Sequence, residues 1–144
     1  MNTLPDPDLA PEFYAGTTSK RFLAWIVDVV LIFIVSGLLV LFTFFLGALI
    51  WPVLYLAVAF IYRTLTLANG SATWGMRFAG VELRDRFGHK FDFGTALLHT
   101  LGYLISVSIP IIQVVSVVVM IGSQRGQGLT DMLLGTAAVN RRVA

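Results

Sequence analysis

The sequence predicts an all-α integral membrane protein with two transmembrane helices, a third proline-kinked apolar segment and a small β-hairpin outside the membrane. Hydrophobic residues make up 57% of the 144 residues and charged residues only 12%, whereas soluble domains carry about 25% charge. Several apolar runs are long enough to enter a bilayer. Turn formers and charges gather between the second and third runs. A chain with so few charges cannot cover its own surface in water, but lipid tolerates exposed apolar faces.

The first segment, residues 1–19, reads MNTLPDPDLAPEFYAGTTS. It has prolines and acids where a signal peptide has a basic start and an apolar centre. We therefore expect a flexible cytoplasmic tail, followed by one membrane domain over residues 20–144. The first apolar segment would then act as an uncleaved insertion signal.

The first two spans lie between Arg21 and Arg63, where 41 residues carry a single charge, Asp28. One span needs about 20 residues, because the hydrocarbon core is roughly 30 Å thick and a helix rises about 1.5 Å per residue. The block is therefore two spans, with a break near Gly47 to Pro52. We expect helices at about 22–44 and 50–67.

The next segment, residues 68–94, mixes turn formers with charges. Apolar and polar residues alternate in VELR (81–84), a period of two that is typical of a strand. A turn at 85–90 precedes the phenylalanines of 91–93. This pattern predicts a β-hairpin on the membrane surface, with an irregular loop as the alternative.

The third apolar segment, residues 95–122, is long for one span and too short for two. Pro110 lacks a backbone donor and should kink the helix. Beyond it we expect a short helix near 126–134 and a short extended piece near 135–140.

The orientation follows from the lysines and arginines of the short loops. With a cytoplasmic N-terminus and three full spans, Arg125, Arg141 and Arg142 fall outside the cell. If 95–122 instead enters and returns on one side, all ten basic residues lie inside. The re-entrant pattern obeys the positive-inside rule better, but its two short arms cannot each cross the lipid, and backbone at depth must be shielded by protein. Both arrangements stay open at this point.

Asp28 is the outstanding candidate for a functional residue. It lies about six positions inside the first span, roughly 10 Å along the helix. An isolated aspartate at mid-membrane costs about 2.5–3.5 kcal/mol, so it must be paired, protonated or exposed to water. Arg21 is seven residues earlier on nearly the same helix face, but about 10 Å away along the axis. A partner from another segment is therefore expected.

Asp131 and His99 are the other candidates for this polar cluster. The functional interpretation is a site that binds a cation or relays protons inside the helix group. The structural interpretation is a buried ion-pair network that only fixes helix packing. A histidine near an interface often makes only a hydrogen bond, and Asp131 also fits an ordinary surface position on a tail helix.

Three motifs resemble those of the RDD family, which is named for one arginine and two aspartates. They are YAGTTSKRFLAWIVD (14–28), ATWGMRFAGVELRD (72–85) and RGQGLTDMLLGTAAV (125–139). The resemblance extends over roughly residues 14–141. It implies that the naming residues are Arg21, Asp28 and Asp131.

The resemblance also has consequences for the membrane arrangement and the function. If the three naming residues meet, Asp131 lies on the same membrane side as Arg21, which favours the re-entrant model. Met76 stands where the family commonly has lysine and Thr130 where it commonly has histidine, which removes two positive partners. For some members a transport role, including cation–proton exchange, has been proposed.

We therefore expect a multi-pass protein of the bacterial inner (plasma) membrane, with transport as its leading function and an accessory or scaffolding role as the alternative. The sequence has no H-E-x-x-H, G-x-S-x-G or phosphate-loop pattern and no cysteine, so we expect no enzyme activity, catalytic residue, metal or cofactor. The basic residues are interpreted as topology signals rather than a nucleic-acid surface. Three apolar segments are few for a solute path, so we expect a homo-oligomer or a membrane partner.

Overall fold

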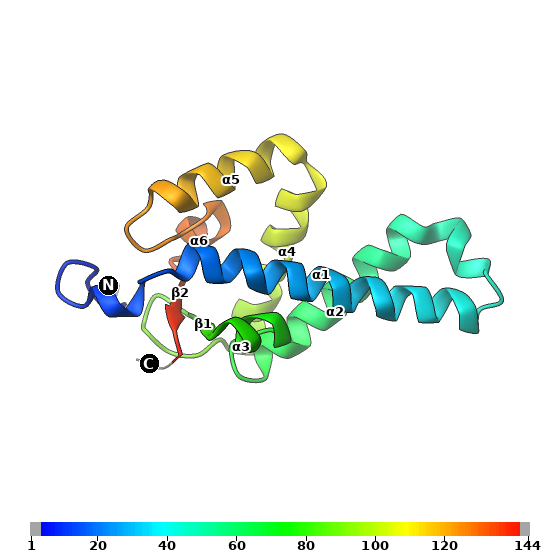
Figure 1. Cartoon of the computed structure of the whole chain (residues 1–144), viewed down its shortest axis with the longest axis horizontal. Helices are drawn as coiled ribbons and strands as arrows, with labels where there is room; N and C mark the ends of the chain where they lie inside the picture. Colours follow the sequence, from blue (N-terminus) through cyan, green and yellow to red (C-terminus); the bar gives the residue numbers. More distant parts are fainter. Residues whose placement is uncertain (1–3, 142–144) are drawn as a thin grey trace.

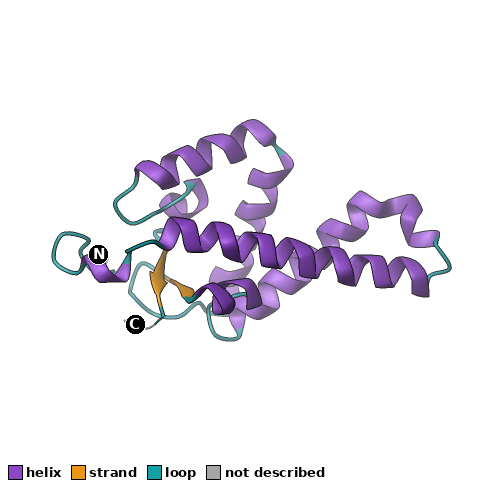
Figure 2. Ribbon diagram, in the orientation of Figure 1, coloured by secondary structure: helices purple, strands orange, loops and turns teal. Residues whose placement is uncertain are grey.

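The computed structural model describes residues 4–141 and is mostly helical (Figures 1 and 2). In chain order its elements are η1 (Pro11–Phe13), α1 (Thr17–Phe42), η2 (Leu46–Ile50), α2 (Trp51–Ala68), α3 (Trp74–Ala79), β1 (Val81–Arg84), α4 (Phe93–Ser108), α5 (Pro110–Gly122), α6 (Leu129–Leu134) and β2 (Ala137–Asn140). The expected class, two long apolar helices with a bent apolar pair and a small antiparallel sheet, is confirmed.

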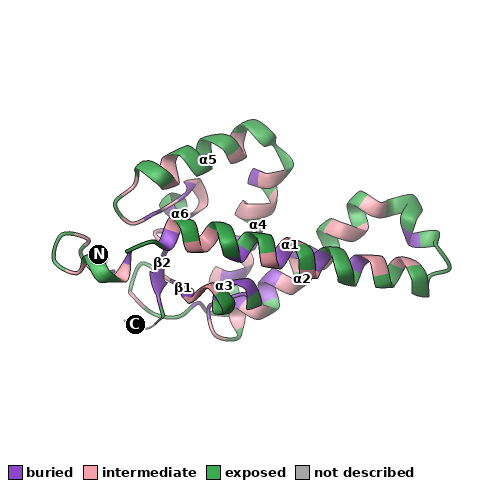
Figure 3. Ribbon diagram, in the orientation of Figure 1, coloured by how far each residue is buried: buried purple, intermediate pink, exposed green. Residues whose placement is uncertain are grey.

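The two long helices form an antiparallel pair that extends as an arm from the rest of the molecule (Figure 1). Both are long and apolar enough to cross a membrane. The break between them falls at residues 43–50, where Phe44 and Phe45 adopt positive φ angles before the short helix η2. The outer half of this arm exposes most of its apolar side chains (Figure 3).

The third apolar segment is broken at Ile109 into α4 and α5, whose axes differ by 116°. Ile109 has an extended backbone, and Pro110 is the first residue of α5. Proline is favoured there because an N–H at the first position of a helix has no partner inside the helix. The proline therefore starts a second helix rather than only kinking the first. The helix α5 then returns toward the N-terminal end of α1 (Figure 1).

The small sheet pairs β1 with β2, and not with the segment 91–93. The expected hairpin is therefore corrected: the strand at 81–84 is present, but its partner comes from the C-terminal extended piece. Phe91 donates its N–H to the buried Ser71 hydroxyl at 3.0 Å, so it is held by the loop before α3. Arg84 is opposite Ala137, and Val81 is opposite Asn140.

The N-terminal segment packs against this sheet. Leu4 and Tyr14 are buried together with Ala137 and Val139. The Tyr14 hydroxyl donates to the carbonyl of Pro5 at 2.6 Å. The helix α1 begins at Thr17, inside the range expected to be a tail. The flexibility of residues 1–19 itself stays a prediction.

Candidate functional site

Two buried carboxylates lie in separate clusters at the end of the molecule where the sheet is. Asp28 is 3% exposed and Asp131 is 1% exposed. Each is surrounded by hydrogen-bond donors from several elements. We name the first group the Asp28 cluster (Asp28, Tyr62, Thr73 and Gly75) and the second the Asp131 cluster (Arg21, His99, Asp131 and Thr136).

The Asp28 cluster is built from neutral donors. Asp28 Oδ1 accepts from the Tyr62 hydroxyl at 2.6 Å and from the Gly75 N–H at 2.9 Å. Asp28 Oδ2 accepts from the Thr73 hydroxyl at 2.6 Å. Within residues 4–141 no ion pair reaches this carboxylate. The hydrogen-bond donors around Asp28 are therefore neutral hydroxyl and amide groups.

The same contacts satisfy the first turn of α3. Its leading N–H groups have no partner inside the helix. Trp74 donates to the Tyr62 oxygen at 3.2 Å, Gly75 to Asp28, and Met76 to the Thr73 hydroxyl at 3.1 Å. Thr73 is thus both the N-cap of α3 and a hydrogen-bond donor to Asp28. The cluster fastens this short helix to α1.

The Asp131 cluster is built around an ion pair. Asp131 Oδ2 accepts from Arg21 Nη1 at 2.6 Å and from the Gly128 N–H at 3.1 Å. Asp131 Oδ1 contacts His99 Nε2 at 2.8 Å and accepts from the Thr136 hydroxyl at 2.7 Å. Four donors occupy the roughly four lone-pair positions of a carboxylate. This group is saturated.

The charge state of Asp131 follows from these contacts. Burial by itself raises the pKa of the Asp131 carboxyl, but the guanidinium of Arg21 and the hydrogen bond from His99 outweigh it and hold that pKa well below its usual range. An ionised carboxylate only accepts hydrogen bonds. His99 Nε2 must therefore carry the proton that it shares with Asp131.

The other ring nitrogen of His99 has no such partner. His99 Nδ1 is buried, and no hydrogen-bond partner lies near it in the part of the chain that the structure describes. In a neutral imidazole whose Nε2 carries the proton, Nδ1 holds a lone pair. His99 Nδ1 is therefore a buried potential proton acceptor, and the other nitrogen of the same ring contacts the carboxylate of Asp131.

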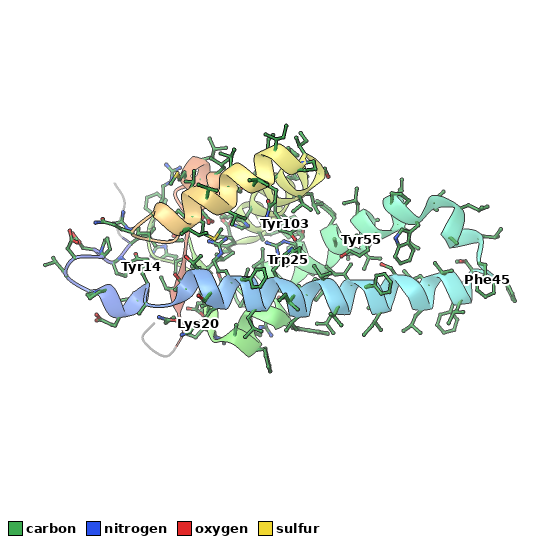
Figure 4. The ribbon with its side chains drawn as sticks, turned by 45° about the horizontal axis from the view of Figure 1, so that its top comes forward. Tyr14, Lys20, Trp25, Phe45, Tyr55 and Tyr103 are labelled. Carbon is green, nitrogen blue, oxygen red and sulfur yellow. The ribbon has the colours of Figure 1, made fainter. Side chains whose placement is uncertain are left out.

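Arg63 on α2 adds a second cation, and this one is buried. It is 4% exposed, and its guanidinium stacks on the ring of Tyr103 at 3.9 Å from the centroid. The Arg63 Nε has no hydrogen-bond partner within residues 4–141. The hydroxyl of Tyr103 in turn accepts from Trp25 Nε1 at 2.8 Å, and Figure 4 shows these two side chains facing each other.

Of the four residues expected in one network, the structure brings together Arg21, Asp131 and His99. Asp28 lies outside that group and is held by its own donors from α2 and α3. The contact of Arg21 with Asp131 is compatible with the re-entrant model, in which both residues lie on the same side of the membrane. The expectation that Asp28 needs partners from other segments is met by neutral groups instead of charges.

Sequence reasoning missed the residues that hold these carboxylates. Tyr62, Thr73 and Gly75 were not singled out, and Arg63 was counted only as a topology residue. One signal was available for Thr73, because a threonine before a short helical stretch is a favoured N-cap. The burial of Arg63 could have been suspected because apolar residues continue after it in RTLTLA.

The described residues contain no group of three or more His, Asp or Glu side chains that could hold a metal ion. What the described residues offer at the two clusters is a set of hydrogen-bond donors around Asp28 and an ion pair and a histidine ring around Asp131. We assign no nucleophile to them.

The comparisons with known proteins agree with the three motifs of the sequence. A model described as the RDD family matches residues 15–135, which is most of the chain. Neither the comparison with curated proteins nor the comparison with solved structures finds a match.

Proposed function

This chain belongs to the RDD family, and from that premise we propose that it is a component of a membrane transport system that moves protons or cations. It is a membrane protein with two apolar helices of spanning length. The observation that carries the proposal is the buried Nδ1 of His99, which has no hydrogen-bond partner among residues 4–141, while Nε2 of the same ring contacts Asp131.

The proposed role of His99 is to accept and release a proton. Asp131 orients the ring and stabilises the imidazolium that forms when Nδ1 takes up a proton. Arg21 keeps Asp131 ionised, so the carboxylate remains an acceptor throughout. Neither carboxylate is the carrier in this scheme, because four donors saturate Asp131 and three neutral donors occupy lone pairs of Asp28.

The test is proton flux in reconstituted vesicles, read with a pH-sensitive dye under an imposed pH or sodium gradient. His99→Gln keeps a side-chain N–H for Asp131 but offers no basic nitrogen. We expect it to lower flux by a factor of about 100 or more, the lower end of what a positioned acid–base group supplies. His89→Gln removes the other histidine, which is exposed in a loop, and should leave flux unchanged. Equal flux in wild type and His99→Gln contradicts the proposal.

A second candidate is a non-enzymatic accessory or scaffolding subunit in which both clusters only lock the fold. The observation that favours it is the complete set of donors around Asp131 and the neutral donors around Asp28. His99→Gln separates the two functions, because a scaffolding subunit carries no flux of its own, and Asp28→Asn tests the role of Asp28. A loss of thermal stability in detergent with unchanged flux supports a structural role for Asp28, whereas a loss of flux at unchanged stability returns Asp28 to the transport path.

The proposed transporter requires an assembly. Two spanning helices and one bent pair are few segments from which a single chain could build a solute path. The outer arm also exposes large apolar side chains such as Phe42, Phe44 and Leu49. We propose that copies of the chain or another membrane protein pack along this arm, which the molecular mass of the purified protein–detergent complex can test.

A further inference from the structure

A basic pocket lies where the N-terminal end of α1, the end of α3 and the strand β2 meet. The cavity has a volume of about 630 Å³, within the range of about 300–1,000 Å³ typical of small-ligand sites. Its wall includes three cationic side chains, Lys20, Arg77 and Arg141, together with Phe78 and Asn140. Among the described residues no acidic side chain lines it. Figure 4 shows Lys20 on the side of α1 that faces this region.

The cations of the pocket are only weakly compensated. Lys20 Nζ donates to the neutral amide oxygen of Asn140 at 2.6 Å. Arg77 Nη2 donates to the backbone carbonyl of Asn69 at 2.7 Å. Arg141 Nε lies 3.7 Å from Glu82, which also pairs with Arg84. One shared carboxylate stands against three cations, so the pocket is suited to an anionic ligand.

An apolar surface borders the pocket on α3. Trp74 and Phe78 are 57% and 72% exposed, and their spacing of four residues places them on one face of the helix. The helix α3 packs closely along α1, with Gly75 against the backbone of Ala24. The two exposed rings therefore lie beside a helix of membrane-spanning length.

The length of α1 relates the pocket to the level of the lipid headgroups. The helix α1 has 26 residues and is thus about 39 Å long, against a hydrocarbon core of about 30 Å. If it is centred in the bilayer, about three residues at each end project beyond the core. Lys20 is the fourth residue of α1 and so lies at the boundary between acyl chains and headgroups.

We infer that this pocket binds the phosphate of an anionic membrane lipid, with the acyl chains lying along Trp74 and Phe78. Lys20 and Arg77 donate to the phosphate oxygens, as basic pockets beside transmembrane helices do for anionic headgroups. The adjoining apolar face favours a lipid over a free phosphate, because a free phosphate has no apolar part that could pack on Trp74 and Phe78. The inference does not depend on proton transfer by His99.

The test is native mass spectrometry of the full chain released from detergent after incubation with phosphatidylglycerol or phosphatidylcholine of matched acyl chains. Wild type should retain phosphatidylglycerol preferentially. Lys20→Gln/Arg77→Gln should lower that retention by about 25-fold, since each of the two basic residues near a charged surface contributes about 1 kcal/mol, or about fivefold. Lys90→Gln removes an exposed cation outside the pocket and should behave as wild type.

Two further arms keep the result interpretable. Lys20 also donates to Asn140, so its loss could disturb the fold. Lipid retention and thermal unfolding are therefore measured for the single variant Arg77→Gln as well. Lys20→Arg, which keeps the positive charge, should retain phosphatidylglycerol as wild type does. Glycerol phosphate at millimolar concentration should not displace the lipid. The inference is overturned if phosphatidylglycerol retention survives in both the single and the double variant. It is equally overturned if glycerol phosphate displaces the lipid, which would make the pocket a site for a soluble phosphate.

Discussion

At the scale of the residue, the two buried aspartates are stabilised by different physics. Asp28 is held by hydroxyl and amide dipoles, and Asp131 by the charge of Arg21 together with neutral donors. An uncompensated charge inside a membrane protein is costly. Both aspartates are surrounded by donors. Because Asp131 is paired with Arg21, we expect the stability of the fold to depend on the ionisation of Asp131.

The depressed pKa of Asp131 predicts a loss of stability in acid. Because its pKa is lower in the folded than in the unfolded chain, the stabilisation is complete above the unfolded value of about 3.9 and is lost as the pH falls toward the folded value. We expect the midpoint of thermal unfolding in detergent to fall steeply below about pH 4. Asp131→Asn should lower the free energy of unfolding at pH 7 by about 3–5 kcal/mol, as for a broken buried ion pair. The stability of this variant should then change less with acid than that of wild type.

The control for this experiment is Asp8→Asn, which removes an exposed carboxylate near the N-terminus. It should reproduce the wild-type pH profile. If wild type and Asp131→Asn lose the same amount of stability between pH 7 and pH 3, the charge of Asp131 does not stabilise the fold.

At the scale of the element, the helix α3 is positioned by a glycine. It has six residues, too few to be stable alone. Its stability comes from the cap by Thr73, from Asp28 and from close packing of Gly75 on α1. A Cβ at Gly75 would overlap the carbonyl oxygen of Ala24 and lie 2.6 Å from Asp28 Oδ1.

Gly75→Ala should therefore push α3 away from α1 and break the hydrogen bonds of the Asp28 cluster. We expect a loss of about 1–3 kcal/mol or more, as for overpacked cores, measured as a lower midpoint of thermal unfolding in detergent. Gly37→Ala is the matched control, because a Cβ there meets no atom within 4 Å in the middle of α1. It should be neutral or stabilising by up to about 1 kcal/mol. Wild-type stability in Gly75→Ala would refute the close contact.

At the scale of the whole molecule, the sheet lies at one end, and the arm of α1 and α2 with its many exposed residues extends from it (Figure 3). The Asp131 cluster lies at the sheet end as well, because its member Thr136 directly precedes β2. Arg21 contacts both Asp131 and the carbonyl of Gly126 at 3.1 Å, so the chain after α5 lies beside the start of α1. The bent pair α4–α5 thus leaves this end and comes back to it. This geometry favours the re-entrant arrangement over a third complete span.

Accessibility labelling can test that arrangement, because the chain has no cysteine of its own. Single cysteines replace Leu9 near the N-terminus, Gln124 after α5 and Leu49 in the turn between α1 and α2, all of them exposed. In vesicles of one orientation, the cysteines at positions 9 and 124 should react with an impermeant reagent from the same side. The cysteine at 49 should react only from the opposite side. Shared labelling of 124 and 49 would establish a third span.

Patterns of consecutive residues were sufficient to predict the membrane class, the two long helices and the interruption of the third apolar segment at Pro110. These features depend on hydropathy and helix rise, which are properties of consecutive residues. The strand at 81–84 was also predictable, because its alternation of apolar and polar residues is local. Asp28 stood out in the same way, as the single charge in a block of 41 residues, whereas the naming role of Asp131 was implied by the family resemblance.

The tertiary structure alone decided which groups meet. Thr73 reaches Asp28 across 45 positions, and Arg21 reaches Asp131 across 110. The partner of β1 was likewise β2, not the nearer segment 91–93. A hydrogen bond forms where folded helices bring donor and acceptor within about 3 Å, and no local pattern encodes that distance. Hydropathy therefore predicted where the chain enters the lipid, while packing determined which charge is paired and which is held by dipoles.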